Sequence, residues 1–516
     1  MIISGGDLGT VVPLEQLLSN GLSNRPESPA ILSLQQSWTY KELDRASDNL
    51  CQNYLDHGLT FGDCVASLMP NRGALLVHYL ACFKAGLIAV PLNYRNTPVE
   101  IAHALDKSGA KFILFHAERE ADIKEAVVTR EMAGFLIFES EGEPAYPLFE
   151  DWISRPGSAA VPTGHPEDTP VFMLFTSGST GPAKGVTHSR KSFAYMYASA
   201  AAGFEMTRED RVLPASSMSH IGGILFSFAV LSLGGLAIVA RAYGPEEVLP
   251  LMRQGKPTVL CMLPLALFNL VRDSRATHVD FATLRMARSG SDKVPIELEN
   301  EFLELTGIPI DEGYGCSEMG LATLSPPSGR IVAGSVGRPI PGFDLAIRDD
   351  DGTDLPPGKP GVVWMRTKSR MMGYWHDTKA TAKVFDGDWF NSGDIMHADA
   401  DGYLFFRGRK KQIIIHNSLN IFPQEVEDAL LLHPSVAAAG VIGIHDLLHG
   451  ENVRAYVVSR PGTSPSEIEL IDHAKVQIGY KAPEEILFID EMPLNPTGKV
   501  DRLSLKRMAE QAHDHS

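Results

Sequence analysis

The chain has 516 residues, of which 44% are hydrophobic and 21% are charged, and its formal net charge is −17 at pH 7. A chain of this length is expected to form about three domains or subdomains and can bury a large core without disulfides or metals. The acidic charge argues against a nucleic-acid partner, because such a partner requires a basic face.

The five cysteines are dispersed along the chain without a CxxC spacing. This pattern argues against a disulfide framework or a zinc site and favours a reducing compartment. The first ten residues, MIISGGDLGT, lack a basic segment followed by an apolar one, so no signal peptide is expected. We therefore expect a cytoplasmic protein.

Helix and strand patterns alternate over the first 116 residues. Thr39 and Glu42 form a capping-box pattern, which predicts the start of a helix. Strand, helix, strand, helix and strand patterns then follow in residues 63–71, 74–86, 87–93, 98–110 and 111–116. This alternation predicts crossover connections and an α/β fold with a parallel sheet.

A glycine-rich loop, TSGSTGPAKG at residues 176–185, follows the apolar strand pattern VFMLF. Its backbone N–H groups, its hydroxyls and Lys184 can hold phosphate oxygens. It is not a Walker A loop, because Ala183 replaces the second glycine and Gly185 replaces the Ser or Thr that would bind Mg²⁺. The residues behind it, GVTH, read as an extended segment, whereas a P-loop leads into a helix.

Residues 222–240 carry no charge and are nearly long enough to span a bilayer. Gly234 and Gly235 divide this run into two apolar pieces. We therefore predict a buried helix, a tight turn and a central strand, and no membrane span.

The composition changes around FRGRKKQ, residues 406–412, and shorter helix and strand patterns follow. Among them, Ser464 with Glu467 predicts another capping box. We place a domain boundary here, with residues 1–409 in an N-terminal domain and residues 410–516 in a C-terminal domain.

Five further motifs complete a set that runs in a fixed order: RSGSDKVP (288–295), DEGYGCSEMG (311–320), DWFNSGDI (388–395), FFRGRKKQIII (405–415) and PLNPTGKVDR (493–502). Together with the glycine-rich loop they resemble the adenylate-forming superfamily, which contains acyl-CoA synthetases, luciferases and the adenylation domains of peptide synthetases. The resemblance is strongest to AMP-forming acyl-CoA synthetases. It implies a large N-terminal α/β domain of several subdomains with parallel sheets, which holds the ATP and acyl-acid sites, and a small mobile α+β C-terminal domain.

The resemblance also implies a nucleotide site. Tyr314 would offer a ring on which adenine stacks, Asp394 and Arg409 would bind the ribose, and Glu318 with Thr176 would bind Mg²⁺. The full set of expected nucleotide contacts is Thr176, Ser177, Gly178, Ser179, Thr180, Gly181, Lys184, Gly290, Ser291, Asp311, Glu312, Gly313, Tyr314, Gly315, Ser317, Asp394, Arg409 and Lys499. The motif at 288–295 departs from the family, since Asp292 and Lys293 stand where Ala and Pro are usual.

The implied reaction has two steps. The carboxylate of an acid attacks the α-phosphate of ATP and forms an acyl adenylate and pyrophosphate, and a thiol then takes the acyl group. Catalysis of the first step depends on alignment and on neutralising the developing negative charge, which is the role expected of Lys499, Lys184, Glu318 and His220. Lys411 falls at the family's hinge position, about which the small domain would turn between the steps.

The substrate side is defined by SSMSHIGG, residues 216–223. An apolar acyl pocket would be lined by His220, Gly222, Gly223, Phe226, Leu263 and Pro264, although the same residues could equally pack the core. The Asp that amino-acid adenylation domains carry before this His is absent, so a fatty or aryl acid is expected.

CoA is the expected acceptor, because no carrier domain follows in the sequence. Ser418 stands where the family usually has Gly, near the path of the thiol, and a side chain there could narrow that path. An enzyme that stops at the adenylate or loads a separate carrier protein is therefore the alternative, and a P-loop ATPase is a remote one. The expected partners are a small carboxylic acid, ATP with Mg²⁺, and CoA; a homodimer is left open.

Overall fold

The computed structural model describes residues 1–176, 183–290, 294–416, 419–446, 449–495 and 499–513. The chain divides into two compact units, which are described separately. The larger unit comprises Ile3–Leu345 and Met365–Phe390, and the smaller unit comprises Met1–Ile2, Ala346–Trp364 and Asn391–Ser516.

The larger unit contains two mainly parallel sheets, each with seven strands among the described residues. Parallel pairing confirms the expected α/β class. The first sheet has the order β20 (Gly373–Tyr374), β9 (Lys184–Ser189), β8 (Pro170–Thr176), β5 (Ile88–Pro91), β4 (Cys64–Leu68), β6 (Phe112–His116) and β7 (Gly134–Phe138). The second has the order β14 (Ile310–Glu312), β13 (Met286–Ser289), β12 (Val259–Met262), β10 (Arg211–Ala215), β11 (Leu236–Ile238), β2 (Pro29–Leu32) and β3 (Ser37–Thr39).

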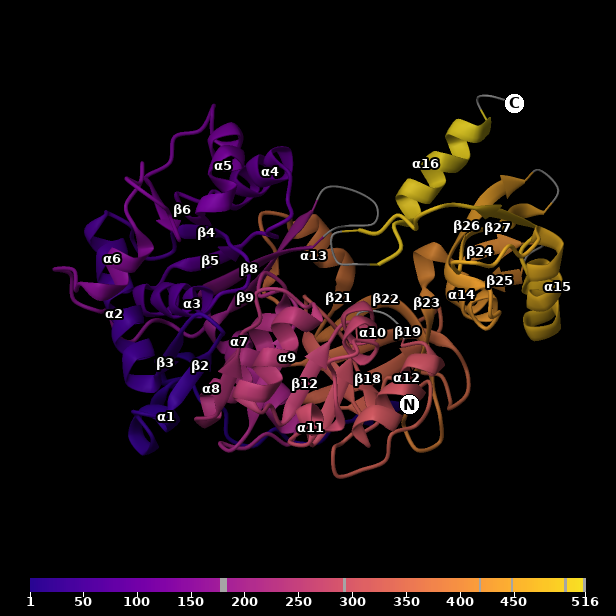
Figure 1. Cartoon of the computed structure of the whole chain (residues 1–516), viewed down its shortest axis with the longest axis horizontal. Coiled ribbons are helices and arrows are strands. Elements are labelled where there is room, and N and C mark those ends of the chain that lie inside the picture. The colour runs from indigo at the N-terminus through magenta and orange to yellow at the C-terminus, as the bar shows by residue number, and fades with distance from the viewer. Residues whose placement is uncertain (177–182, 291–293, 417–418, 447–448, 496–498, 514–516) are drawn as a thin grey trace. The chain divides into compact units, whose positions relative to one another are not determined.

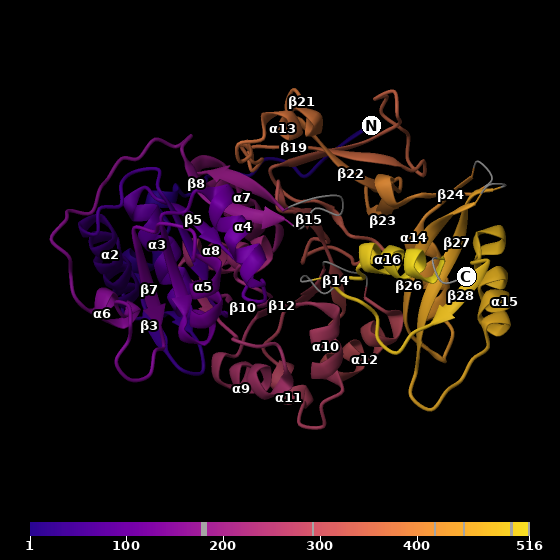
Figure 2. The same cartoon turned by 90° about the horizontal axis from the view of Figure 1, so that it is seen from above.

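The helices of the first sheet follow the predicted alternation. The capping box at Thr39 is present: Glu42 N–H donates to the Thr39 hydroxyl, and the Glu42 carboxylate accepts from Thr39 N–H. Figures 1 and 2 both show α2 and α3 side by side near the N-terminal strands. The helices in the N-terminal part of the chain are α1 (Ser19–Asn24), α2 (Tyr40–Asp56), α3 (Gly73–Ala85), α4 (Pro98–Ser108), α5 (Glu120–Ala126) and α6 (Phe149–Ser154).

The uncharged run at residues 222–240 folds as predicted. It forms α8 (Ile221–Leu233), a left-handed turn at Gly234 with φ 88°, and β11, which lies between β10 and β2 in the second sheet. Positive φ favours glycine, which explains why the run is broken there. None of the described helices has the length and the apolar character needed to cross a membrane.

The rest of the larger unit consists of further helices and a small antiparallel sheet. The helices are α7 (Arg190–Gly203), α9 (Pro245–Gly255), α10 (Pro264–Val271), α11 (His278–Phe281), α12 (Ile296–Thr306) and α13 (Thr378–Val384). The small sheet has the order β15 (Tyr314–Cys316), β16 (Gly320–Leu324) and β17 (Arg338–Pro339). β21 (Phe385–Asp386) also belongs to this unit, whereas β1 (Ile2–Ser4), β18 (Phe343–Arg348), β19 (Gly361–Thr367) and β22 (Trp389–Ala398) contain residues of both units.

The smaller unit ends in a separate core formed by a mixed sheet and its helices. The strand order is β25 (Leu419–Ile421), β24 (Ile414–His416), β27 (Gly450–Ser459) and β26 (Val436–Asp446), with β28 (Glu485–Phe488) also paired to β27. The helices are α14 (Pro423–Leu431), α15 (Glu467–Ile478) and α16 (Arg502–His513). A 3₁₀ helix, Lys410–Gln412, lies between this sheet and β23 (Leu404–Arg409), close to the predicted domain boundary.

One predicted cap in this unit is wrong. α15 is capped by Ser466 and Glu469, two residues beyond the predicted pair of Ser464 and Glu467. Glu467 is the first residue of the helix, and its carboxylate instead accepts from Ile486 N–H of β28 at 3.0 Å. Because Glu467 contacts β28, Glu469 is the acidic residue that completes the capping box of α15.

Candidate active site

The predicted phosphate loop lies at the end of a β-hairpin. β8 and β9 are antiparallel, and Thr176 and Lys184 are paired across them at the open end of the loop. Because the loop leads into a strand, the hairpin argues against a P-loop, whose phosphate lies at a helix N-terminus. The predicted phosphate contacts Ser177, Gly178, Ser179, Thr180 and Gly181 lie outside the described residues.

Lys184 and Glu318 meet at one side chain, Tyr374. The Lys184 ammonium lies 4.7 Å from the centre of the Tyr374 ring, and the Tyr374 hydroxyl donates to Glu318 Oε1 at 2.9 Å. Burial and the Glu318 carboxylate raise the pKa of Tyr374 well above its usual value, so the hydroxyl stays a donor. The structure thus brings together two predicted ATP-binding residues through a tyrosine that the motifs did not identify.

Backbone contacts fix the segment around Glu318. Met371 N–H donates to the Glu318 carbonyl at 2.7 Å, and His188 Nε2 lies 2.7 Å from the Ser317 carbonyl. Burial lowers the pKa of His188 to about 4, so the ring is neutral near pH 7 and Nε2–H donates to this carbonyl. Glu318 is therefore held at both backbone and side chain.

The predicted adenine-side residues follow the ends of β13 and β14. Asp311 is fully buried; one carboxyl oxygen accepts from Ser325 N–H at 3.1 Å, and Oδ1 has no hydrogen-bond partner within the described part of the chain. Burial raises the pKa of Asp311 to about 7. Glu312, Tyr314 and Ser317 are partly exposed, whereas Gly290 and Gly313 are buried and Gly315 is exposed; Ser291 lies outside the described residues.

His220, at the N-cap of α8, is hydrogen-bonded to Asn93, which follows β5 of the first sheet. Asn93 Nδ2 lies 3.3 Å from His220 Nε2, and burial lowers the pKa of His220, so Nε2 acts as the acceptor. Asn71 holds the loop before His220, because its Oδ1 accepts from Met218 N–H at 2.8 Å and its Nδ2 donates to the Ser216 carbonyl at 2.9 Å. Both asparagines follow strands of the first sheet and were not identified from the motifs.

The other predicted pocket residues have different surroundings. A Cβ at Gly223 would lie 2.5 Å from the Ser217 carbonyl oxygen, so this glycine permits a close approach of two backbones. A Cβ at Gly222 would have its nearest neighbour 3.7 Å away. Leu263 and Pro264 are partly exposed at the start of α10, and Phe226 is buried.

The smaller unit holds the remaining predicted residues. Asp394 and Arg409 are cross-strand partners in β22 and β23, and Asp394 Oδ1 lies 3.1 Å from Arg409 Nε. Lys411 lies in the exposed 3₁₀ helix. Lys499 is partly exposed, and its backbone N–H donates to Asn495 Oδ1 at 3.1 Å. Ser418 lies outside the described residues.

The donor set fits Mg²⁺ that is carried largely by a triphosphate. Within the described ranges, no three His, Cys, Asp or Glu side chains are grouped so that they could hold a metal. Glu318 would supply one carboxylate, and Thr176 would supply a hydroxyl. Mg²⁺ in nucleotide sites is commonly bound by one or two carboxylates together with phosphate oxygens and water.

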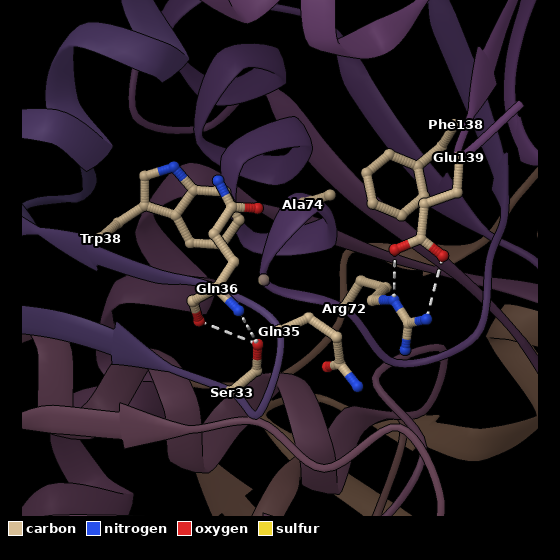
Figure 3. Close-up of a pocket in the computed structure, with 9 residues that line it drawn as sticks. Ser33, Gln35, Gln36, Trp38, Arg72, Ala74, Phe138 and Glu139 are labelled. Carbon is tan, nitrogen blue, oxygen red and sulfur yellow. Dashed lines mark hydrogen bonds and ion pairs between the residues drawn. The ribbon is translucent and has the colours of Figure 1, made fainter.

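A separate small pocket contains none of the predicted site residues. Figure 3 shows the Arg72 guanidinium directed at Glu139 inside it; the paired N–O distances are both 3.0 Å. Arg72 follows Asn71 directly and is itself buried. This ion pair anchors the segment from which Asn71 reaches the loop before His220.

The thiols differ in accessibility. Cys51, Cys64, Cys82 and Cys261 are buried, and Cys316 in β15 is partly exposed. Burial raises the pKa of Cys51, Cys64 and Cys261 to about 12 and that of Cys82 further still. These four thiols stay protonated near neutral pH.

Known proteins are similar to this chain in sequence and in fold. Residues 19–375 match the AMP-binding enzyme family, and residues 425–499 match the AMP-binding enzyme C-terminal domain. The chain is 32% identical to the fatty acid–[acyl-carrier-protein] ligase ScoC of Streptomyces coeruleorubidus, over 96% of each chain. It is 31% identical to a long-chain-fatty-acid–CoA ligase of Yersinia pestis, over 96% of this chain and 94% of that protein. Among solved structures, ATP-bound MatB from Rhodopseudomonas palustris matches with a TM-score of 0.88 at 26% identity, over 96% of this chain and 99% of MatB.

The chain therefore belongs to the AMP-binding enzyme family. This confirms the resemblance to adenylate-forming enzymes, the α/β fold with a C-terminal AMP-binding domain, and the enzyme class, an AMP-forming acid–thiol ligase. The roles of individual site residues stay predictions.

Proposed function

We propose that the protein is an acyl-CoA synthetase that uses ATP and Mg²⁺ to convert a fatty or aryl acid into its acyl adenylate and then transfers the acyl group to CoA. The observation that carries this proposal is the convergence of Lys184 and Glu318 on Tyr374 beside the glycine-rich loop. A cation and a metal-binding carboxylate at the same point suit a triphosphate whose α-phosphate is attacked.

Each residue contributes one task to adenylation. Lys184, with the backbone of the loop, would hold the β- and γ-phosphates, and Glu318 with Thr176 would hold the metal. Bound Mg²⁺ would offset the charge of the phosphates. Lys499 bridges the acyl carboxylate and the α-phosphate, while Asp394 and Arg409 bind the ribose. Positioning of this kind converts binding energy into alignment of the reacting groups.

The acid side is apolar around Phe226, and a neutral His220 held by Asn93 adds no charge. Apolar and neutral side chains such as Phe226 and His220 favour the hydrocarbon part of an acid. The names of ScoC and of the Yersinia pestis enzyme, both ligases of fatty acids, support this class of substrate.

The thiol that accepts the acyl group, CoA or a carrier protein, distinguishes two candidate functions. ScoC is named as a ligase for an acyl carrier protein, and the Yersinia pestis relative as a ligase for CoA. With Ser418 in a position where the family usually has Gly, loading of a carrier protein is the second candidate. CoA remains the first candidate, in keeping with the name of the Yersinia pestis relative.

A panel of carboxylic acids scored by pyrophosphate release tests the first half-reaction. The best acid is then supplied with CoA or with a phosphopantetheinylated carrier protein, and thioester formation is followed by mass spectrometry. CoA-dependent AMP release supports the synthetase. Thioester on the carrier protein alone supports the second candidate, and ATP hydrolysis to ADP without any acid contradicts both.

Three further assignments belong to this proposal. The mobile C-terminal domain begins at residue 410, next to the 3₁₀ helix Lys410–Gln412. The protein acts in the cytoplasm, where its cysteines remain thiols. Sedimentation analysis distinguishes a monomer from a homodimer.

A further inference from the structure

Arg288 lies at the junction of the predicted acyl and nucleotide sites, although no motif assigns it a role. It is in β13, next to Cys261 of β12 and Asp311 of β14 in the sheet register. Its guanidinium carbon is 5.3 Å from the centre of the Phe226 ring, and its Nη2 donates to the Gly313 carbonyl at 3.1 Å. The side chain therefore contacts the acyl side with its face and the nucleotide side with one nitrogen.

The surrounding backbone leaves space for this guanidinium. A Cβ at Gly290 would lie 2.7 Å from Arg288 Nη2, and a Cβ at Gly313 would lie 2.9 Å from Nε. Both distances are shorter than carbon–nitrogen contact allows, so glycines at these two positions fit the guanidinium. The fit fixes its position between α8 and the end of β14.

The cation lacks a full set of partners. Nε is buried and makes no hydrogen bond to any residue that the structure describes. Asp311 and Glu312 act on the Arg288 charge through space, without a hydrogen bond to it. Asp311 is also a poor counter-ion, because burial raises its pKa to about 7 and leaves it only partly ionised at neutral pH.

Arg288 as a whole is partly exposed, but desolvation of any part of a charged group is costly unless that part is paired and hydrogen-bonded. The face of Phe226 offsets part of this cost by a cation–π contact, but it offers no acceptor for Nε. Arg288 is partly exposed as a residue, so the outer nitrogens of this fixed guanidinium, rather than the enclosed Nε, are suited to an oxygen acceptor on a ligand beside Phe226.

We propose that Arg288 is a substrate-recognition residue that binds a second oxygen acceptor on the acyl group, with a second carboxylate preferred over a hydroxyl. The proposal rests on the proposed function and narrows its substrate class from simple fatty or aryl acids to acids with a polar far end. A carboxylate is preferred because it satisfies the donor and also neutralises the cation.

The test compares matched acids with the wild-type protein. One series is a six-carbon monocarboxylic acid, its ω-hydroxy derivative and the six-carbon dicarboxylic acid; the other is cinnamate with and without a hydroxyl or carboxyl group on the para carbon. The readout is kcat/KM for pyrophosphate release. We expect the acids with a second acceptor to be preferred, and Arg288→Met to reduce that preference by about 10- to 100-fold, the range for loss of one charged hydrogen bond. Arg288→Lys should retain part of it.

Arg272→Met is the matched control. Arg272 also lies over a phenylalanine ring, 4.0 Å from the centre of Phe268, but it is surface-exposed and already paired with Glu301. This variant should leave the acid preference unchanged. Circular dichroism and thermal melting establish that each variant is folded.

The outcomes distinguish a failure of the role of Arg288 from a failure of the proposed function. Equal rates for all acids of a series, or a preference that Arg288→Met does not alter, overturn the role of Arg288 and leave the proposed function intact. A rise in KM for ATP with an unchanged acid preference assigns the guanidinium to the nucleotide and overturns the proposal as well. If no acid supports pyrophosphate release, the proposed function fails and this inference fails with it.

Discussion

Tyr374 lies between two residues of the predicted phosphate and metal site. Its ring face contacts the Lys184 ammonium, while its hydroxyl contacts the Glu318 carboxylate. The ring therefore separates two opposite charges that would otherwise neutralise each other. Both remain available to a ligand that carries negative phosphates and a metal cation.

Glu318→Gln tests the metal assignment. The amide keeps the shape of the side chain and can still accept from Tyr374, but it lacks the charge that Mg²⁺ prefers. We expect pyrophosphate release to fall by about 100-fold or more, by analogy with the loss of other electrostatic groups in active sites. Tyr374→Phe is the control; it removes only the hydroxyl and should cost much less. Near-normal turnover of Glu318→Gln at ordinary Mg²⁺ concentrations would contradict the assignment.

Asp311→Asn tests the buried carboxyl group through the pH dependence of stability. Burial raises the pKa of Asp311 from 3.8 to about 7, so the folded protein binds a proton that the unfolded chain releases. The favourable contribution is complete below pH 3.8 and is lost as the pH rises through about 7. The free energy of unfolding of wild type relative to Asp311→Asn should therefore fall between about pH 4 and 7, by up to about 4 kcal/mol, and then level off. A difference that does not depend on pH would show that the carboxyl group titrates normally.

At the scale of single residues, the sequence motifs predict which side chains belong to the site better than they predict which residues contact those side chains. Glu318, Lys184 and Asp394 stand in recognisable motifs, but Tyr374 is 56 positions from Glu318, and Asn93 is 127 positions from His220. Neither partner has a local pattern, because their contacts arise only when strands distant in the chain come together.

The helix α8 shows what local patterns do predict. Its apolar composition, and the glycines that end it, identified the helix, the turn and the interior strand correctly. The same patterns placed the cap of α15 two residues too early, because Glu467 is used by β28. The apolar pattern of a buried helix can be recognised from that segment alone. The choice between two nearby capping residues depends on contacts with another part of the chain.

Gly222 and Gly223 of α8 give a matched pair of variants. Gly223→Ala would force a methyl group to within 2.5 Å of the Ser217 carbonyl, so the loop that carries His220 must shift. Overpacking of this kind typically costs about 1–3 kcal/mol. Gly222→Ala has room for its methyl group and should be neutral or slightly stabilising in a helix. Urea denaturation of both variants measures the difference; equal stability would show that the contact at Gly223 relaxes freely.

At the scale of the whole molecule, the predicted site residues are divided between the two compact units. Thr176, Lys184, His220 and Glu318 belong to the larger unit, whereas Asp394, Arg409, Lys411 and Lys499 belong to the smaller. The order of the motifs along the chain identified these residues, but it does not predict how the residues of one unit are placed relative to those of the other. A rearrangement between two reaction steps leaves no signature in residue spacing, which is why the hinge stays a prediction.

Lys411→Pro tests the hinge. Proline fixes φ and lacks an N–H, so the exposed 3₁₀ helix Lys410–Gln412 could not pass through new backbone angles. We expect adenylate to form from ATP and acid at a rate close to wild type, and thioester to form from supplied adenylate very slowly. Single-turnover assays measure each step. Equal losses in both steps, with an unchanged circular dichroism spectrum, would refute the hinge.

The unequal burial of the thiols has an analytical consequence. Four cysteines are enclosed and protonated, while Cys316 is partly exposed two residues before Glu318. An alkylating reagent should therefore attach once to the folded protein, and intact-mass spectrometry would read the adduct directly. ATP should slow this labelling and CoA alone should not, so the untagged protein carries its own occupancy reporter. Multiple adducts under native conditions, or a rate that ATP does not change, would contradict this expectation.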